Sequence, residues 1–352
     1  MPSDFTATEF LRRFTGAFRP RPEIYWSDLL ASAGVGWAVF VASTWAPPGS
    51  LLHVVATVVA VMLLLRAAIF IHELAHLKRG TLPGFEAAWN LLVGLPFLLP
   101  SLMYVGSHGD HHRQTAFGTA DDPEYAPMAR WGGLRIARFV ASMLAVPVLL
   151  AVRWGVLGPL SFLVPRLRRL VVERASTLVI NTGYRRPAPR GRQAVRWILQ
   201  ETAAAMVFWV VAAGGIAGWI SPRWLLQWYI VAAGILLVNQ VRTLAAHGYD
   251  NDGAQLDSLG QFLDSVTLSG WSIPTALAAP LGLRYHALHH CLPTVPYHSL
   301  GALHRRLLAE LPLDSPYRRT QRGGILSVVH DLLRQTPREA DMLSEDRATG
   351  GV

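Results

Sequence analysis

Residues 51–76 read LLHVVATVVAVMLLLRAAIFIHELAH, and this stretch decides the fold. From Leu51 to Ile71 it is almost wholly apolar, and about 20 such residues form a helix that crosses roughly 30 Å of hydrocarbon. The stretch then turns into His72-Glu73-Leu74-Ala75-His76. We therefore expect a membrane helix that carries two histidines at one of its ends.

The composition of the whole chain agrees with a membrane protein. Of its 352 residues, 51% are hydrophobic and 16% are charged, and the mean hydropathy is +0.29. The single cysteine, Cys291, excludes a disulfide framework or a cysteine-rich metal site and is expected to pack as a small apolar residue. The net charge of +9 comes mainly from arginines beside apolar runs, which favours a membrane surface over nucleic acid as a partner.

Four apolar stretches predict transmembrane helices in two hairpins. The first hairpin is 29–46 and 51–71 around the turn 47–50, and the second is 197–220 and 224–244 around 221–223. The segment 166–196 carries nine arginines against Glu173, so the positive-inside rule places it in the cytoplasm and both turns outside. The predicted fold class is all-α, an integral membrane protein with a cytoplasmic histidine-rich cap.

The remaining segments are assigned less directly. Residues 91–105 and 139–165 are apolar but interrupted by prolines, so we expect interfacial or re-entrant pieces, with full spanning as the alternative. Residues 1–28 are expected to be a cytoplasmic arm, in which Phe5, Phe10, Phe14 and Phe18 suggest a surface helix and a disordered tail is the alternative. The membrane domain then covers 29–310, and 311–352 is a polar tail.

Three histidine clusters stand out: His72-Glu73-Leu74-Ala75-His76, His108-Gly109-Asp110-His111-His112 and His286-Ala287-Leu288-His289-His290. On a helix, offsets of three and four residues bring side chains to one face. Each cluster lies beside a membrane segment on the same predicted side. We therefore interpret the eight histidines as one metal-binding set.

Eight imidazoles are too many for one zinc ion, which takes four ligands in a structural site and usually three in a catalytic one. Two metal ions use them all. Iron, zinc and copper accept imidazole, and iron is the one that activates dioxygen near lipid. A carboxylate di-iron bundle needs two Glu-x-x-His pairs, and this sequence has only Glu73 to His76.

The three boxes in this order resemble the integral-membrane fatty acid desaturases and their hydroxylase relatives. The resemblance runs from about Leu51 to Arg306, and it includes three further phrases. These are FGT at 117–119 with DDPEY at 121–125, NQVRTLAAH at 239–247, and GLRY at 282–285 with LPTVPYH at 292–298.

The resemblance implies a centre of two non-haem irons that reduces dioxygen with electrons from an external donor such as ferredoxin or a cytochrome b5-like protein. It implies desaturation of a long fatty acyl chain, lipid-linked or carrier-linked, at the cytoplasmic side of a bacterial inner membrane. It also implies His247 as a ninth ligand, although Asp250 or Asp252 could pair with it instead. The oligomeric state is not predicted.

Other residues receive lesser roles. His53 lies at the outer end of a span and is not expected to bind metal, whereas His298, His304 and His330 are expected to be outer-sphere or surface groups. Asp110 and either Asp121 or Asp122 are candidate acceptors for imidazole N–H groups. Arg66 is expected to extend to the interface, and the arginine-rich loop to contact lipid headgroups or an acidic electron carrier. The candidate walls of a substrate cleft are Trp209, Trp228, Tyr229 and Trp271.

Competing functions remain open at this point. His72 to His76 is also a literal HExxH, the zincin signature, so a membrane metalloprotease with Glu73 as its base is the alternative from another class. It leaves two boxes unexplained. A metal transporter would require ionisable groups in the middle of its membrane spans, and the predicted spans lack them. A hydroxylase or a carotenoid-modifying enzyme uses the same iron chemistry.

Overall fold

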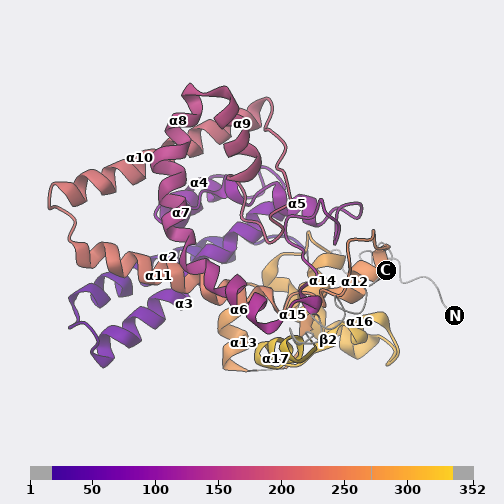
Figure 1. Cartoon of the computed structure of the whole chain (residues 1–352). Helices are drawn as coiled ribbons and strands as arrows, with labels where there is room; N and C mark the ends of the chain where they lie inside the picture. Colours follow the sequence, from indigo (N-terminus) through magenta and orange to yellow (C-terminus); the bar gives the residue numbers. More distant parts are fainter. Residues whose placement is uncertain (1–17, 271, 336–352) are drawn as a thin grey trace, which may run out of the picture.

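The computed structural model describes residues 18–270 and 272–335, and the fold is almost entirely helical (Figure 1). The strands among these residues are one parallel pair, β1 (Thr267–Leu268) and β2 (Gln321–Arg322). This confirms the predicted all-α membrane architecture, with one candidate span beyond the four expected. The helices long and apolar enough to cross a membrane are Pro22–Trp45, Leu51–His76, Val146–Leu163, Arg192–Ile216 and Pro222–Thr243.

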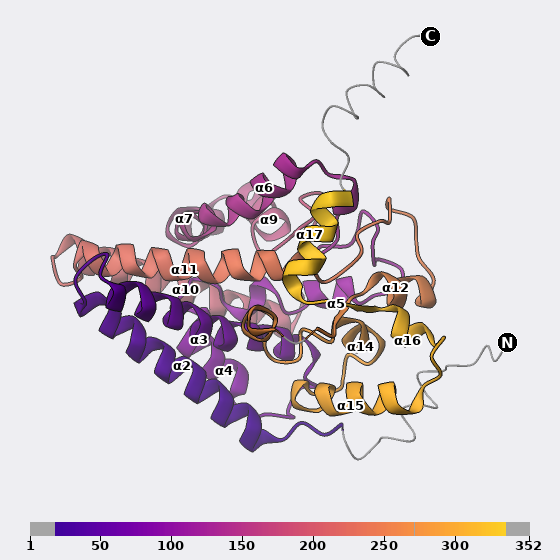
Figure 2. The same ribbon diagram turned by 90° about the horizontal axis from the view of Figure 1, so that it is seen from below.

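Four of these candidate spans form the two predicted hairpins. Helix α2 (Pro22–Trp45) packs along α3 (Leu51–His76), and α10 (Arg192–Ile216) leads into α11 (Pro222–Thr243). The second helix of each hairpin begins after a serine whose hydroxyl accepts a backbone N–H of the first turn. The two hairpin turns meet, because the Arg223 guanidinium donates a hydrogen bond to the Ala46 carbonyl. Both turns therefore lie at one end of the molecule (Figure 2).

The fifth candidate span is a broken helix made of α7 (Val146–Val152), the π-helical turn η5 (Arg153–Leu157) and α8 (Gly158–Leu163). The sequence favours an interfacial piece here, yet the length and composition of 146–163 also suit a crossing. Arg153 is buried against the Glu201 carboxylate of α10, which also lies 2.6 Å from Arg168. The buried charges thus have partners, as burial in a membrane requires.

The other ambiguous stretch, 91–105, does not form a span. It follows α4 (Phe85–Trp89) and runs through the π-helical turn η1 (Asn90–Gly94) and the 3-10 helix η2 (Ser101–Met103). The indole N–H groups of Trp37 and Trp228 donate to the carbonyls of Leu92 and Pro96 at 2.7 and 2.9 Å. Irregular backbone is tolerated at membrane depth only where protein groups satisfy it in this way.

The start of the chain differs in detail from the expectation. Asp28 of α2 accepts hydrogen bonds from Arg66 Nε at 2.8 Å and Nη2 at 2.5 Å. Arg66 therefore pairs with a carboxylate instead of extending to the headgroups. Of the predicted arm, residues 1–17 lie outside the described part of the chain, and Phe18 packs against an apolar cluster of the cap.

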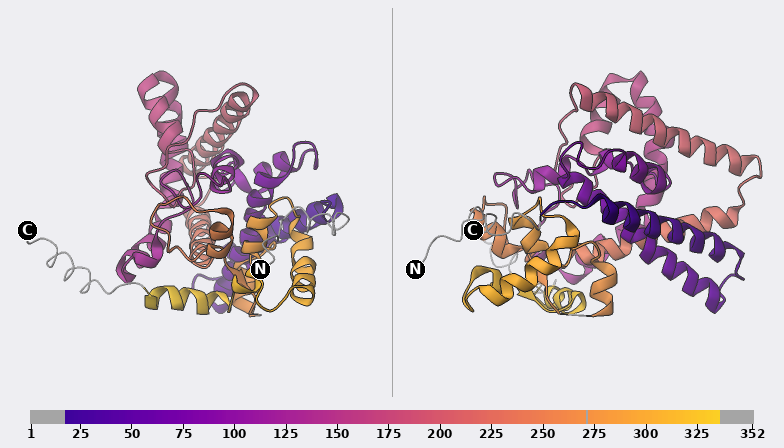
Figure 3. Two further views of the ribbon diagram at one scale, coloured as in Figure 1. Left: turned by 90° about the vertical axis from the view of Figure 1, so that its right-hand side faces the viewer. Right: turned by 180° about the vertical axis from the view of Figure 1, so that it is seen from behind.

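The remaining elements form a cap at the end of the spans opposite the hairpin turns (Figure 3). The cap contains α5 (Ser107–His111) and α14 (His286–Cys291). Residues 316–335, expected to be tail, fold onto it: β2 pairs with β1, and α17 (Ile325–Gln335) buries Leu332. The other elements are η3 (Met128–Arg130), α6 (Gly133–Ala141), η4 (Ser142–Leu144), α9 (Pro165–Arg174), α12 (Ser258–Asp264), α13 (Ile273–Ala278), α15 (Tyr297–Glu310) and α16 (Pro316–Arg319).

Candidate metal centre

The three histidine boxes lie on separate elements that converge beneath the cap. Helix α3 carries His72 and His76 one turn apart near its C-terminal end, so both rings leave the same face. Helix α5 carries the second box, with His112 as the residue that ends it, and α14 carries the third. His247 follows α11 and forms an isolated β-bridge with Ser265.

Nine histidines form two groups, and within each group the candidate ligand atoms lie within 4.8 Å of one another. These are the nine positions selected from the sequence, and the structure brings all of them together. The first group draws on all three boxes, and the second combines the last two boxes with residue 247. The five-histidine group is His72, His76, His108, His112 and His289, and the four-histidine group is His111, His247, His286 and His290.

Within each group the Nε2 atoms face one another. In the five-histidine group, His289 Nε2 lies 3.0 Å from His76 Nε2. In the four-histidine group, His286 Nε2 lies 3.0 Å from that of His247 and 3.1 Å from that of His290. Two nitrogens bound to one ion at about 2.1 Å, about 90° apart, are about 3.0 Å from each other. The spacings therefore fit nitrogens that share an ion in each group.

Unpartnered buried nitrogens give a second test of this fit. Both ring nitrogens of His72 and Nδ1 of His286 are buried and have no hydrogen-bond partner. A buried polar atom left unpaired costs about 1–3 kcal/mol. A cation bound by the five-histidine group would satisfy Nε2 of His72. The donor set, which is imidazole throughout, also suits iron.

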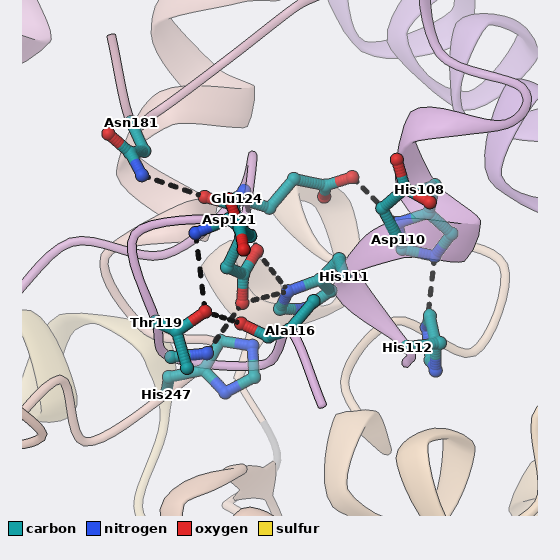
Figure 4. Close-up of polar contacts among 12 residues, drawn as sticks. His108, Asp110, His111, His112, Ala116, Thr119, Asp121, Glu124, Asn181 and His247 are labelled. Carbon is teal, nitrogen blue, oxygen red and sulfur yellow. Dashed lines mark hydrogen bonds and ion pairs between the residues drawn. The ribbon is translucent and has the colours of Figure 1, made fainter. Parts of the chain in front are cut away.

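Asp122 orients the four-histidine group. It is fully buried, and its two carboxylate oxygens lie 2.9 and 3.0 Å from His111 Nδ1, in the region drawn in Figure 4. The carboxylate also accepts the backbone N–H groups of Gly118 and Glu124, each at 2.8 Å. Burial disfavours the charged form of His111, but the charge and hydrogen bond of Asp122 outweigh it and raise the pKa of this imidazole. Such a contact fixes Nδ1–H and leaves Nε2 free for a metal.

Two further carboxylates contact imidazole Nδ1 atoms, Glu124 through a hydrogen bond and Asp264 as a close ion-pair contact. Glu124 lies 2.8 Å from His108 Nδ1, and the Tyr104 hydroxyl contacts both residues at 3.1 and 2.8 Å. Burial raises the pKa of Glu124 to about 7. Asp264 lies 3.1 Å from His247 Nδ1. Carboxylate contacts therefore orient members of both groups.

Apart from His111, the imidazoles of the two groups outside the spans have a lowered pKa, which favours the neutral form that binds metal. Burial is the largest cause that lowers their pKa, and neighbouring histidines lower it further. His247 shows the same direction even though Asp264 opposes it. The residues whose pKa lies well below its usual value in this way are His108, His112, His286, His289 and His290.

Several polar residues proposed from the sequence lie elsewhere. Asp110 accepts a hydrogen bond from the Tyr184 hydroxyl at 2.5 Å and does not orient an imidazole. Asp121 is exposed, so its neighbour at position 122 fills the predicted role. Asp252 lies 3.6 Å from Arg130 and leaves His247 to Asp264, which the sequence analysis did not select.

Four histidines belong to neither group. His53 lies near the first hairpin turn, where its Nδ1 contacts the Ser43 carbonyl. His298 accepts the backbone N–H of Arg21, and His304 is buried beside a tyrosine hydroxyl. His330 is exposed on α17. None of the four is a candidate ligand.

The geometry does not suit the zincin interpretation of HExxH. Glu73 accepts hydrogen bonds from the Tyr25 hydroxyl and from the backbone N–H of Tyr297, the latter at 3.4 Å. Its carboxylate is thereby committed to the packing of α2 and α15. His72 and His76 are completed by three further imidazoles and not by a water beside this glutamate.

Arg242 is a polar neighbour of the histidines that sequence reasoning did not identify. Its Nε is buried without a hydrogen-bond partner. Together with His72, Tyr104 and Glu124 it lines a cavity of about 20 Å³ between the two groups. Tyr104 and Asp264 were missed as well: Tyr104 is only four residues from His108 but belongs to no histidine box, and Asp264 is remote in sequence from His247.

An apolar cavity of about 90 Å³, here called the inner cavity, lies beside the metal centre within the spans. Ile71, next to His72, lines it together with Asn239, Phe97 and Leu99. This narrow apolar space therefore reaches the residue next to the first histidine box.

Comparisons with known proteins agree with this site. The profile of the family described as Fatty acid desaturase matches residues 48–322. The chain is 42% identical over 317 residues to a protein of Caulobacter vibrioides (strain NA1000 / CB15N) named Ceramide hydroxylase, covering 90% of each chain. No solved structure matches the chain significantly. With these matches and two histidine groups at the end of its spans, the chain belongs to the fatty acid desaturase family, the group of membrane oxidoreductases that the three boxes resemble.

Proposed function

We propose that this protein is an iron-dependent hydroxylase that inserts one oxygen atom of O2 into a hydrocarbon chain of a ceramide-type lipid. The observation that carries the substrate and the outcome is the 42% identity to a ceramide hydroxylase over 90% of both chains. The reaction consumes R–H, O2, two electrons and two protons, and it yields R–OH and water.

The five-histidine and four-histidine groups would each hold one iron. Bound iron supplies the dioxygen chemistry that breaks an unactivated C–H bond. The chain's own residues fix the ligands: Asp122, Glu124 and Asp264 hold the Nδ1 atoms of His111, His108 and His247, which keeps their Nε2 atoms turned inward. These contacts preorganise the imidazoles, as a site that reacts with dioxygen requires.

The inner cavity would hold the part of the chain that reacts. With a volume of about 90 Å³, it has room for only a short piece of hydrocarbon chain. A chain so confined presents few carbons to the metal centre. The lining of the cavity therefore limits which C–H bond is attacked.

Orientation and electron supply complete the proposal. We place the cap in the cytoplasm of a bacterial inner membrane, because the arginines of 166–196 lie at that end and both hairpin turns at the other. An external donor, ferredoxin or a cytochrome b5-like protein, would deliver the electrons. The same basic segment offers charge complementarity to an acidic donor.

Desaturation, the outcome expected from the sequence, is the second candidate. It uses the same metal centre but removes two hydrogens and forms two waters. The family match includes the desaturases, and the position of the second C–H bond decides between the outcomes. We place hydroxylation first because of the curated relative.

The test is expression in a host that makes ceramides but lacks this enzyme, followed by lipid mass spectrometry under ¹⁸O2. Gain of one labelled oxygen in a ceramide supports the proposal. Loss of two hydrogens without oxygen would assign desaturation instead. An unchanged lipid profile in cells whose purified enzyme carries iron and accepts electrons would refute a lipid substrate.

A further inference from the structure

A second and much larger apolar cavity lies on the membrane side of the inner cavity. Its volume is about 780 Å³, within the range of about 300–1,000 Å³ typical of pockets that bury whole small molecules. Helices α2, α10 and α11 and the segment around η1 line it. We call it the outer cavity, and Trp37, Phe208, Ala212, Gly215, Trp224 and Trp228 are among its lining residues.

The outer cavity opens sideways to the region that lipid occupies. At its edge, the side chains of Leu91 and Ile216 are 70% and 89% exposed. No lining residue is ionisable except Tyr229, whose hydroxyl donates to the Leu144 carbonyl at 3.0 Å. An unhydrated space of this kind between membrane-spanning helices fits a hydrocarbon chain and nothing polar.

A thin partition separates the two cavities. In the irregular segment after η1, Phe97 and Leu99 line the inner cavity while Pro96 and Leu98 line the outer one. The Phe97 ring is stacked on Trp37 at a centroid distance of 5.1 Å. Leu98 has a φ of 56°, a left-handed conformation that costs a non-glycine residue energy and recurs where function requires it.

The two cavities differ in the length of chain that they can take. With volumes of about 780 and 90 Å³, the outer cavity takes a much longer piece of hydrocarbon chain than the inner one. A single-chain substrate would fill the inner cavity and leave the larger space to other lipid. A lipid with two chains can occupy both at once, one chain on each side of the partition.

We propose that the outer cavity is the binding site for the second, unreacted hydrocarbon chain of a two-chain lipid substrate. This inference rests on the proposed function, and it assigns the two hydrocarbon chains of the ceramide-type substrate to separate cavities. The unreacted chain anchors the lipid laterally, and the partition keeps it away from the irons. Recognition is by shape and apolar contact, so removal of that chain should weaken binding in proportion to its length.

The experiment fills the outer cavity without touching the centre. Ala212→Phe places a ring in it, and Ala213→Phe is the matched control, because residue 213 is the exposed neighbour on the same helix and does not line the cavity. Gly215→Leu is a second filling variant, because a Cβ there meets only Leu225 Cδ1, at 3.7 Å. Each variant is assayed in mixed micelles with a two-chain ceramide and with analogues in which either chain is cut to two carbons.

The proposal predicts a selective loss. Ala212→Phe and Gly215→Leu should lower kcat/KM for the two-chain lipid about tenfold, as expected when roughly two methylene groups are expelled. Turnover of the accepted one-chain analogue, the iron content and the activity of Ala213→Phe should stay as in the wild type. Equal loss on both substrates would place the cavity on the path of the reacting chain, and no loss would make it a site of bulk lipid. Either result overturns the proposal, whereas a wild-type enzyme that oxidises none of these lipids would refute the proposed function itself.

Discussion

Replacement of Asp122 by asparagine should weaken one of the two proposed irons and spare the other. Asp122 is buried and accepts three N–H donors, from His111 Nδ1 and from the backbone of Gly118 and Glu124. Asparagine has the same shape but only one acceptor oxygen, and its NH2 group must face at least one of these donors. His111 would lose both its charged partner and its fixed orientation.

The magnitude follows from these contacts. Loss of a partner that orients a metal ligand lowers metal affinity about 10–100-fold, or about 1.4–2.7 kcal/mol. An unpaired buried N–H adds a cost of about 1–3 kcal/mol to the folded state. The affected iron is that of the four-histidine group, because His111 belongs to it. The five-histidine group has no contact with Asp122 through its own imidazoles and should keep its ion.

The assay is dialysis of purified protein against a graded series of chelator concentrations, followed by iron analysis and ⁵⁷Fe Mössbauer spectroscopy. Asp121→Asn is the matched control, since it makes the same chemical change at the exposed neighbouring residue. We expect about one iron per chain in Asp122→Asn under conditions in which the wild type and Asp121→Asn keep two. If the two variants retained iron equally, Asp122 would not orient His111 as argued here.

Further predictions concern residues beside the centre. Glu73→Gln should keep iron and most of the activity, because Glu73 contacts two tyrosines. His72→Ala should lose both the iron and the activity. Equal inactivation of the two variants would support the protease alternative. Burial raises the pKa of Cys291 to about 11, so at pH 8 only about one thiol in a thousand is ionised, and maleimide labelling should be slow until the protein is unfolded. Labelling should quicken about tenfold per pH unit up to pH 10, and rapid labelling at pH 7 would contradict this. Arg153→Met should lower the free energy of unfolding by about 3 kcal/mol, because the buried Glu201 loses one of its two arginine partners. A melting temperature in detergent equal to that of the wild type would show that this ion pair does not stabilise the fold.

The eight box histidines could be predicted from the sequence as candidate ligands because they recur at short spacing. Offsets of three and four residues within each box mark one face of a helix, so all eight box histidines could be chosen without knowledge of the fold. His247 has no such pattern around it, and its selection depended on the family resemblance. The structure brings it to the other histidines through the end of α11.

The groups that orient the ligands were harder to predict, because tertiary structure brings them there. Asp122 and Glu124 lie 11 and 16 residues from the histidines that they contact, in a loop without a regular period. The sequence could offer Asp122 only as one of two neighbours. Asp264 comes from another helix, and no local signal points to it.

The interfacial interpretation of 139–165 was drawn without its tertiary contacts, and Val146–Leu163 within it is a candidate span by length and composition. Arg153 in the middle of an apolar stretch argues against a membrane helix when it is considered alone. Its partner Glu201 is 48 residues away, on a different helix, so the neutralised pair appears only in the folded structure. The segment 316–335 was likewise expected to be tail, because the chain turns polar from Leu311, and the packing of Ile325 and Leu332 appears only in the folded structure.

Metal analysis of the purified protein tests the central claim most directly. The account predicts about two irons per chain, less than stoichiometric zinc, and Mössbauer signals of two distinct sites that correspond to the five-histidine and four-histidine groups. Growth in ⁵⁷Fe medium and purification without added metal keep the measurement free of exchange. One zinc per chain without iron would contradict the account, because it would leave most of the nine gathered imidazoles without a role.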